Sequence, residues 1–228
     1  MKRILCALFC ILLLFSVCSC NTDPGDPTPE EIYKLEGGKK AFDSNVSSRV
    51  KTLKGKTIIY GTKDCSSDYK TAIKKAANNI TETSSQITFK VDANSNTGNY
   101  RAGVYDSSSG QECYYNGRFY TLRAAMAANI PSEYFVVGAN AFNNFTSNSS
   151  SSTIYFNREY MDDYTQGAKT MLAMHELGHT LGFIDFQNDT YVYKYDATVM
   201  KADYCSGYTV LTDYTEFDKK CITDLYGA

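Results

Sequence analysis

Short segments in which apolar and polar residues alternate recur along the chain, and this period of two predicts β-strands with one buried face. The candidate strands are residues 56–60, 87–91, 100–105, 134–137 and 153–156. Between the first two, apolar residues return every three or four positions, which predicts a helix from Ser66 to Ile80 that lays one face on a sheet. Residues 107–131 give no clear period, and the Asn- and Ser-rich stretch 140–152 predicts an exposed loop.

The amino terminus is different in kind, because it is an almost unbroken apolar run. Lys2 and Arg3 precede this run, which extends from Ile4 to Val17 and falls short of the roughly 20 residues that a membrane-spanning helix needs. A basic start followed by a short apolar run is typical of a secretory signal peptide. Residues 1–19 are therefore interpreted as a signal peptide.

The apolar run closes on Val17-Cys18-Ser19-Cys20, which resembles the lipobox of bacterial lipoproteins. This resemblance implies that Cys20 is lipidated and anchors an exported protein to a membrane of the bacterial cell envelope. An ordinary cleaved signal with a stray cysteine is the alternative. Residues 20–50 are expected to hold the lipidated cysteine and a flexible tether, because residues 21–31 contain three prolines and four acidic residues without periodicity. Acidic residues this close to the anchor favour display at the cell surface.

Composition narrows the class of protein. The chain has 228 residues, and removing the signal leaves about 209, a usual size for one domain, which we place at residues 51–228. The net charge is −2 and the 23 basic residues are scattered, so no basic face for nucleic acid is expected.

The cysteines agree with export. Four of the eight lie in the signal and lipobox, and an even number remains in the body. Those four are Cys65, Cys113, Cys205 and Cys221, which predict two disulfides in an exported chain. Cys65–Cys113 with Cys205–Cys221 is the preferred pairing, although sequence alone allows three connectivities. A structural zinc site is the weaker reading, because no C-x-x-C pair is present.

One motif carries the chemistry: His175-Glu176-x-x-His179-x-x-Gly182-x-x-Asp185. A helix of 3.6 residues per turn brings the two imidazoles to one face, where both can reach one Zn²⁺ ion. Glu176 is then placed to act as the general base toward water. Gly182 permits positive φ, so the chain can turn sharply and return Asp185 as the third ligand. Three protein ligands leave zinc a fourth position for water.

The histidine count strengthens the motif, because the chain contains two histidines and both lie in it. The competing interpretation is a buried helix whose polar residues are paired with one another, since short motifs recur by accident.

The motif is the signature of the metzincin zinc peptidases, and its Asp variant resembles the snapalysin-type members. Ala197 to Met200 is similar to the family's methionine turn, and the segment from Thr212, as helix cap, to the C-terminus resembles the last helix of matrixins and HEIGH-type bacterial peptidases. The resemblance spans roughly residues 50–227, of which only 175–185 is specific. It implies an α+β fold: a twisted mixed sheet with a backing helix, an active-site helix, and a small C-terminal subdomain ending in a helix.

Two departures from the family affect the site. Its more usual third ligand is His, which leaves Asp189 and Asp196 as rivals of Asp185. Some members have a tyrosine two residues after the turn methionine that stabilises the transition state. That position is Ala202 here, so Tyr204 is the candidate, and a packed wall residue is its alternative role.

These observations predict a monomeric zinc metalloendopeptidase that hydrolyses peptides or proteins. Two alternatives remain open: a surface-anchored binding or adhesion module on a peptidase scaffold, and a zinc amidase acting on cell-wall peptide.

Overall fold

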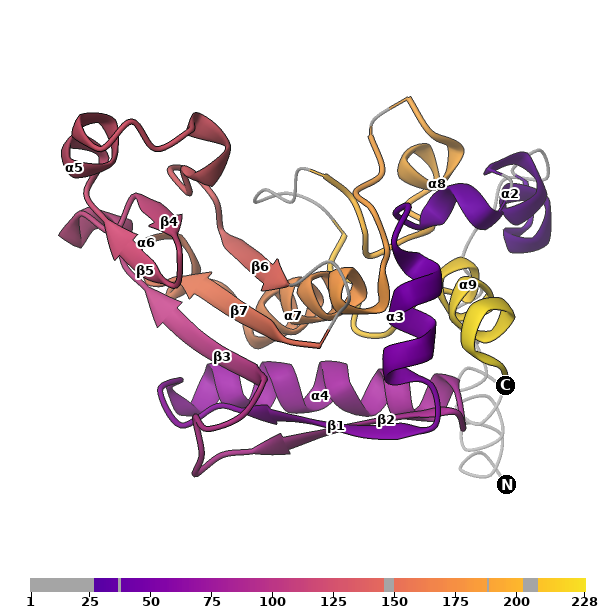
Figure 1. Cartoon of the computed structure of the whole chain (residues 1–228). Helices are drawn as coiled ribbons and strands as arrows, with labels where there is room; N and C mark the ends of the chain where they lie inside the picture. The colour runs from indigo at the N-terminus through magenta and orange to yellow at the C-terminus, as the bar shows by residue number, and fades with distance from the viewer. Residues whose placement is uncertain (1–26, 37, 146–149, 188, 203–208) are drawn as a thin grey trace, which may run out of the picture.

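A five-stranded mixed sheet forms the centre of the computed structural model, which describes residues 27–36, 38–145, 150–187, 189–202 and 209–228 (Figure 1). The strand order is β2-β1-β3-β7-β6. The strands are β1 (Lys56–Gly61), β2 (Ile87–Asp92), β3 (Tyr100–Tyr105), β6 (Ala141–Phe145) and β7 (Ser152–Asn157). The pairs among β2, β1, β3 and β7 are parallel, and β6 pairs antiparallel with β7 at the edge. The predicted mixed sheet is confirmed.

Two long helices, α4 (Ser67–Thr83) and α7 (Gln166–Leu181), lie side by side against the sheet. Tyr69, Ile73 and Ile80 are buried along one side of α4, as its apolar period predicts. They belong to the main core, which also takes in Ile58 and Phe89 from the strands. The backing helix is therefore α4, and α7 is the helix that contains the histidine motif.

Four of the five predicted strands are present, as β1, β2, β3 and β7. The predicted strand 134–137 is wrong, because Ser132–Tyr134 forms the 3-10 helix η3 and Phe135 makes only an isolated bridge to Cys113. The predicted loop 140–152 is wrong over residues 141–145, which form β6. The side chain of Asn143 on this strand hydrogen-bonds to α7, so β6 lacks the apolar alternation that reveals the other strands.

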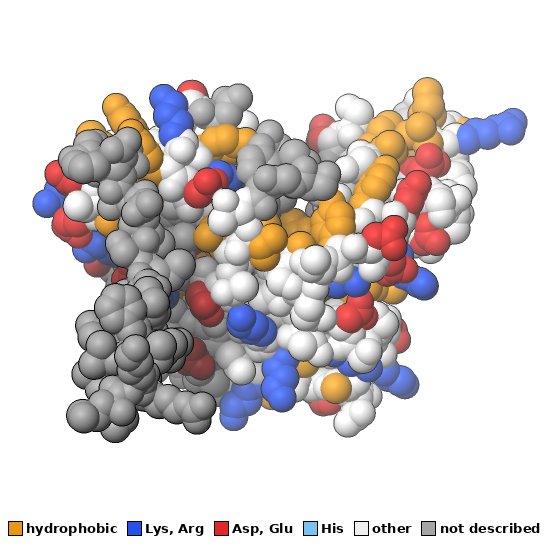
Figure 2. Space-filling model, turned by 180° about the vertical axis from the view of Figure 1, so that it is seen from behind, with side chains coloured by type: hydrophobic (Ala, Val, Ile, Leu, Met, Phe, Trp, Pro, Cys, Tyr) orange, Lys and Arg blue, Asp and Glu red, His pale blue; other side chains and the backbone are white. Residues whose placement is uncertain are grey.

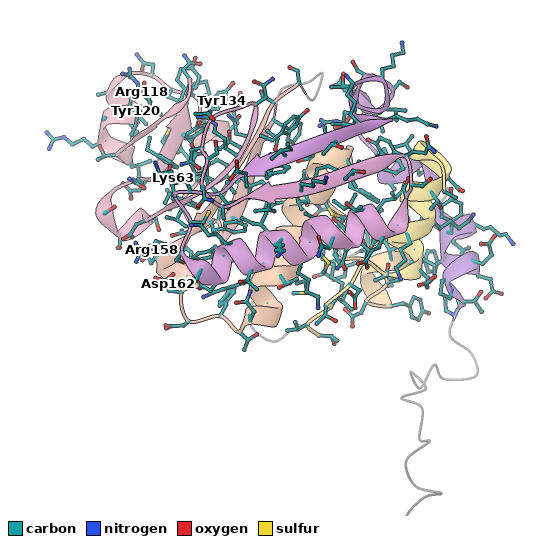
Figure 3. The ribbon with its side chains drawn as sticks, turned by 90° about the horizontal axis from the view of Figure 1, so that it is seen from below. Lys63, Arg118, Tyr120, Tyr134, Arg158 and Asp162 are labelled. Carbon is teal, nitrogen blue, oxygen red and sulfur yellow. The ribbon has the colours of Figure 1, made fainter. Side chains whose placement is uncertain are left out.

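A small lobe is inserted between β3 and β6. It consists of η2 (Ser107–Ser109), β4 (Cys113–Tyr115), β5 (Arg118–Tyr120), α5 (Leu122–Ala127) and η3. Its β4–β5 hairpin is antiparallel, and its centre is a separate apolar cluster that contains Cys113, Ala125 and Ile130. Arg118, Tyr120 and Tyr134 lie in this lobe (Figure 3), with the Arg118 guanidinium 4.8 Å from the Tyr120 ring centroid.

The amino-terminal part of the described chain is folded, so the expected tether is wrong for residues 29–50. It forms α2 (Pro29–Glu36), η1 (Gly38–Ala41) and α3 (Val46–Leu53). Ile32, Ala41 and Leu53 are buried in the main core, but they are too widely spaced to give a period in the sequence. The predicted signal peptide and Cys20 lie outside the described residues. No helix in the part of the chain that the structure describes has the length and apolar character needed to cross a bilayer.

Three further helices complete the described chain: α6 (Arg158–Met161), α8 (Tyr191–Lys194) and α9 (Glu216–Tyr226). The last begins later than predicted, because Thr215 rather than Thr212 is its N-cap. Thr215 Oγ1 accepts from Asp218 N at 3.1 Å, and Thr215 N donates to Asp218 Oδ2 at 3.2 Å. A threonine followed three residues later by an acidic residue satisfies two backbone donors at once, which favours this start.

The predicted Cys65–Cys113 disulfide is wrong, because both residues are free and buried in different places. Cys65 belongs to the main core, whereas Cys113 lies in the separate cluster of the small lobe. Cys221 is also a buried free thiol, and its predicted partner Cys205 lies outside the described residues.

The reverse face of the molecule carries side chains of both charges (Figure 2). Lys and Arg side chains occur there together with Asp and Glu across the described surface.

Candidate metal centre

The motif helix ends where the sequence predicts. Thr165 is the N-cap of α7, and Gly182 is its C-cap with φ 105°, a backbone conformation that other residues adopt only with strain. The space is also tight, because a Cβ at Gly182 would lie 3.0 Å from Arg49 Cδ and 3.1 Å from Val46 Cγ2, so both side chains would have to shift slightly. Glycine therefore lets the chain leave the helix and turn back along it.

His175, His179 and Asp185 meet at one point. His175 Nε2 and His179 Nε2 lie 3.2 Å apart, and Asp185 Oδ1 lies 3.1 Å from the first and 3.3 Å from the second. These residues are the one group in the described chain whose His, Cys, Asp or Glu ligand atoms could hold a metal ion together. Ligands about 2.0–2.1 Å from a tetrahedral zinc lie about 3.3–3.4 Å from each other, so the observed spacing fits zinc with little adjustment.

The outer ring nitrogens fix the neutral tautomer of both histidines. His175 Nδ1 lies 3.0 Å from Val199 O, and His179 Nδ1 lies 3.0 Å from Phe183 O. A carbonyl oxygen only accepts, so each Nδ1 carries its hydrogen and donates it. In neutral imidazoles both Nε2 atoms then present lone pairs, toward each other and toward the Asp185 carboxylate. Three acceptors this close require a cation between them, either a proton or a metal ion.

The pKa shifts of His179 and Asp185 also indicate a site that favours a cation. Burial lowers the pKa of His179, but the hydrogen bond to Asp185 and the charges of Glu176 and Asp185 outweigh it and raise the pKa to about 9. Burial raises the pKa of Asp185, yet its bonds to the two histidines hold that pKa well below its usual range. The pocket therefore favours positive charge beside an ionised Asp185.

Glu176 lies next to this cluster, with one carboxylate oxygen that has no hydrogen-bond partner among the described residues. The residue is 3% exposed, and this oxygen is Oε2. Burial raises the pKa of Glu176, against the charges of His175 and His179, which lower it. A buried carboxylate oxygen left without a donor costs free energy unless a ligand or water meets it, which is typical of a functional group.

The methionine turn lies beneath the motif helix. Met200 is fully buried, and a Cβ at Gly178 would collide with its Sδ, so the glycine allows this close approach. Phe186 N donates to Met200 O at 2.7 Å, and Ala202 N donates to Phe186 O at 3.0 Å. The turn is thus hydrogen-bonded to the segment that directly follows Asp185. Met200 therefore packs directly against the motif helix at Gly178.

Sequence reasoning missed Asp218, which holds this turn. Thr198 Oγ1 donates to Asp218 Oδ1 at 2.6 Å, and Val199 N donates to Oδ2 at 3.0 Å. Val199 O is the acceptor of His175 Nδ1, so α9 supports a zinc-ligand candidate through the turn. Burial raises the pKa of Asp218 to about 6, although its hydrogen bonds lower it. The threonine-to-acid spacing from Thr215 could have revealed its capping role, but its bonds to the turn are long-range.

Asn143 on the edge strand was missed as well. Its Nδ2 donates to Glu176 O at 2.5 Å and to Thr180 Oγ1 at 2.8 Å. Ser152 Oγ donates to Asn143 Oδ1 at 2.7 Å, and Tyr60 joins the same buried group through Ser152 and Thr180. This network fixes β6 against the turn of α7 that contains Glu176. The amide gave no signal because it lies in a stretch rich in Asn and Ser.

The rival carboxylates lie apart from the cluster. Asp189 is exposed, and the exposed Asp196 forms an ion pair with Lys201. Neither belongs to the metal-ligand group. Tyr204 lies outside the described residues.

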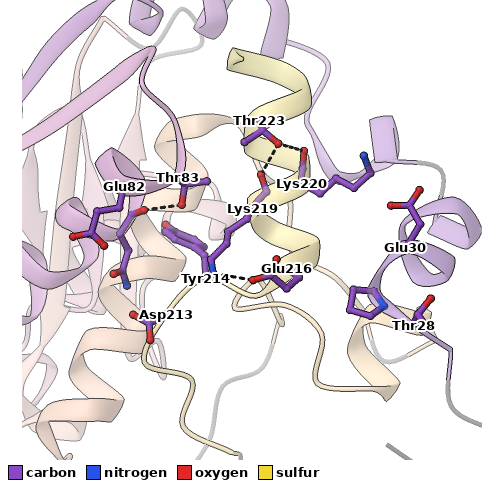
Figure 4. Close-up of a pocket in the computed structure, with 12 residues that line it drawn as sticks. Thr28, Glu30, Glu82, Thr83, Asp213, Tyr214, Glu216, Lys219, Lys220 and Thr223 are labelled. Atoms are coloured by element: carbon purple, nitrogen blue, oxygen red, sulfur yellow. Dashed lines mark hydrogen bonds and ion pairs between the residues drawn. The ribbon is translucent and has the colours of Figure 1, made fainter. Parts of the chain in front are cut away.

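A cavity among the described residues lies away from the motif. About 850 Å³ in volume, it lies between the start of α2, the end of α4 and α9 (Figure 4). None of the motif residues lines it, so its size does not mark the chemical site.

Comparison with known proteins adds a resemblance to two solved structures. No family model matches the chain, and no curated protein matches it. A structure of myroilysin is similar at a TM-score of 0.43 and 18% identity, covering 78% of this chain and 97% of that one. A crystal structure of myroilysin gives a TM-score of 0.44 at 15% identity, with 83% and 96% covered. At these TM-scores the family is not identified, and function is inferred from the metal centre alone.

Proposed function

We propose that this chain is a zinc-dependent metallopeptidase in which His175, His179 and Asp185 hold the metal and Glu176 is the general base. The observation that carries the proposal is the trio of acceptor atoms 3.1–3.3 Å apart, with both Nδ1 atoms already committed to carbonyl groups. Two imidazoles and one carboxylate are a ligand set that catalytic zinc uses. The chain supplies all three ligands itself, which supports a monomeric enzyme.

A zinc ion held by these residues would supply Lewis acidity, which lowers the pKa of water and polarises a substrate carbonyl. Glu176 has the complementary task. Its unpartnered Oε2 accepts a proton from water as that water attacks the carbonyl, and then delivers the proton to the leaving amine. Because burial raises the pKa of Glu176, the carboxylate holds that proton more readily between the two transfers.

The edge strand offers a place for an extended substrate. In the described sheet β6 pairs on one side with β7 and ends the strand order on the other. An extended peptide can add to such an edge through main-chain hydrogen bonds. Because Asn143 fixes β6 to the carbonyl of Glu176, a peptide bound along β6 would lie beside the general base. This arrangement favours cleavage within a chain, and therefore an endopeptidase.

Hydrolysis of a broad peptide library by the purified protein, with and without a chelator, tests the proposal. Cleavage that a chelator abolishes and added zinc restores is the expected result. Bound zinc with no turnover on any peptide would instead favour the binding or adhesion module. Turnover of cell-wall peptides alone would favour the amidase.

We also propose that the protein is exported and anchored through a lipid on Cys20, on the evidence of the basic, apolar and lipobox segments. Radiolabelled palmitate should enter the wild type but not Cys20→Ser. Equal labelling of the variant would remove Cys20 as the acceptor.

A further inference from the structure

The position of the Asp185 carboxylate must be fixed by something other than the contacts of the carboxylate itself. Within the described part of the chain, it bonds only to the two histidine Nε2 atoms. Its side chain is 42% exposed, and it follows a turn that begins at a glycine with positive φ. The position of this ligand must therefore be set by the backbone of residues 182–185.

That backbone is hydrogen-bonded to the amino-terminal segment. Asp43 N donates to Gly182 O at 2.9 Å, and Ile184 N donates to Ala41 O at 3.0 Å. Between these two bonds Phe42 and Phe183 form a bridge, with ring centroids 4.7 Å apart. Asp185 directly follows Ile184, the last residue of this hydrogen-bonded pair of segments. Residues 41–43 thus form a short antiparallel partner for the ligand turn.

Arg49 connects this partner to the motif helix. Its side chain is fully buried, with Nη2 2.6 Å from Asp43 Oδ2 and Nη1 donating to His179 O at 3.2 Å. Its guanidinium carbon lies 4.1 Å from the centroid of the Phe145 ring on the edge strand. The planar guanidinium can bond to a carboxylate and a carbonyl in fixed directions, and its charge suits the carboxyl end of a helix.

We propose that Arg49, together with Asp43, is a positioning residue for the metal centre: it holds the Gly182–Asp185 turn so that Asp185 reaches the ion. This inference rests on the proposed function. Among the described residues, Arg49 bonds to the Asp43 carboxylate and to the His179 carbonyl group rather than to a ligand atom, so it acts through the turn and through His179 O. Residues 41–49 accordingly support the metal centre through the turn.

Zinc affinity separates this role from a general contribution to stability. Arg49→Met keeps a long apolar side chain and removes the charge and the bonds to Asp43 and His179, whereas Arg49→Lys keeps the charge. The matched control is Lys169→Met at the other end of α7, where Lys169 is 6% exposed and its Nζ lies 2.5 Å from Asp68 Oδ2. Zinc Kd is measured by competition with a chromophoric chelator, and the melting temperature of each metal-free protein is measured in EDTA.

Arg49→Met should weaken zinc binding about 10–100-fold, the usual loss when a support of a metal ligand is removed. Arg49→Lys should lose less, and Lys169→Met should bind zinc as the wild type does while its metal-free melting temperature falls. Wild-type affinity in Arg49→Met, or an equal loss in Lys169→Met, would overturn the proposal. If Arg49→Met does not fold, Asp43→Asn replaces it, and unchanged affinity there has the same meaning.

A double-mutant cycle locates the effect at Asp185. If Arg49 acts through this ligand, Arg49→Met should cost little further zinc affinity once Asp185 is alanine. Full additivity would contradict the positioning role. A wild-type protein that binds no zinc would instead reject the proposed function itself, so the two failures are distinguishable.

Discussion

The two halves of α7 both pack into the main core, but the polar groups that they bury differ. In the first half, Met171, Leu172 and Ala173 are buried in the main core, and Lys169 pairs with Asp68 of α4. In the second half, Met174, Leu177 and Leu181 belong to the same core, and the polar His175 and Glu176 are buried beside them. Apolar burial stabilises both halves, whereas the second half also carries the motif residues, whose burial costs free energy.

This difference explains how one helix serves both stability and chemistry. The motif residues in the second half of α7 are supported from outside the helix by Val199 O, by Asn143 and by Arg49. Each support comes from a different part of the chain, namely the methionine turn, the edge strand and α3. Substitutions of the motif residues and of their supports should therefore change metal binding or turnover, whereas substitutions in the first half of α7 should change only stability.

The largest effect is expected at Asp185. Asp185→Ala removes one of three ligand atoms that lie within 3.3 Å of one another, so most zinc and nearly all activity should be lost. Asp189→Ala and Asp196→Ala are the controls, because both carboxylates lie outside the ligand group. Elemental analysis of the three purified variants decides the matter. Full zinc occupancy in Asp185→Ala would remove it from the ligand set.

Glu176→Gln should leave zinc in place and lower kcat by about two to four orders of magnitude, the usual contribution of a positioned general base. The amide nearly matches the carboxylate in shape but cannot accept the proton. Turnover of a fluorogenic peptide, compared at equal zinc content, measures the loss. Unchanged turnover would exclude Glu176 as the base.

The free energy of unfolding of the metal-free protein should fall as pH rises from about 4 to 6, because the buried Asp218 carboxyl group loses its proton over this range. Its pKa is raised by burial from 3.8 to about 6, so the folded state binds a proton more tightly than the unfolded state does. Stability present below pH 4 is then lost through the folded pKa, by about 3 kcal/mol at roughly 1.4 kcal/mol per pKa unit.

Asp218→Asn is the control, because it cannot titrate. Denaturant unfolding of both proteins in EDTA at several pH values gives the comparison. Parallel pH profiles of the two proteins would show that Asp218 titrates alike in the folded and unfolded states.

The smallest effect is expected at Lys169, in the first half of α7. Lys169→Met removes a charge-assisted bond to the partly exposed Asp68, so the free energy of unfolding should fall by about 1–3 kcal/mol. Turnover at equal fractions of folded protein should not change, because Lys169 is six residues before His175 and contacts α4. A loss of turnover in the folded fraction would show that the two halves are coupled.

Features set by local sequence pattern could be predicted from the sequence, whereas those set by contacts between distant residues could not. The placement of His175, Glu176, His179 and Gly182 was predictable because it follows from helical spacing and from backbone conformation. The short strands and α4 were predictable for a similar reason, since apolar period is a local property.

The supports were not predictable, because each depends on contacts between distant residues. Arg49 bonds to His179 from 130 positions away, and Asn143 reaches Glu176 from 33. β6 was misread as a loop because it lies in a stretch rich in Asn and Ser without apolar alternation, although Ala141 and Phe142 pack against apolar clusters. The Cys65–Cys113 pairing was wrong because an even cysteine count does not show that the two residues belong to separate apolar clusters.

A crystal structure of the zinc-loaded protein, with anomalous data on both sides of the zinc edge, tests the central claim most directly. A single strong anomalous peak is expected about 2.0–2.2 Å from His175 Nε2, His179 Nε2 and an Asp185 carboxylate oxygen. Absence of a peak at this cluster, or a peak coordinated by other residues, would contradict the assignment of these residues as the metal centre.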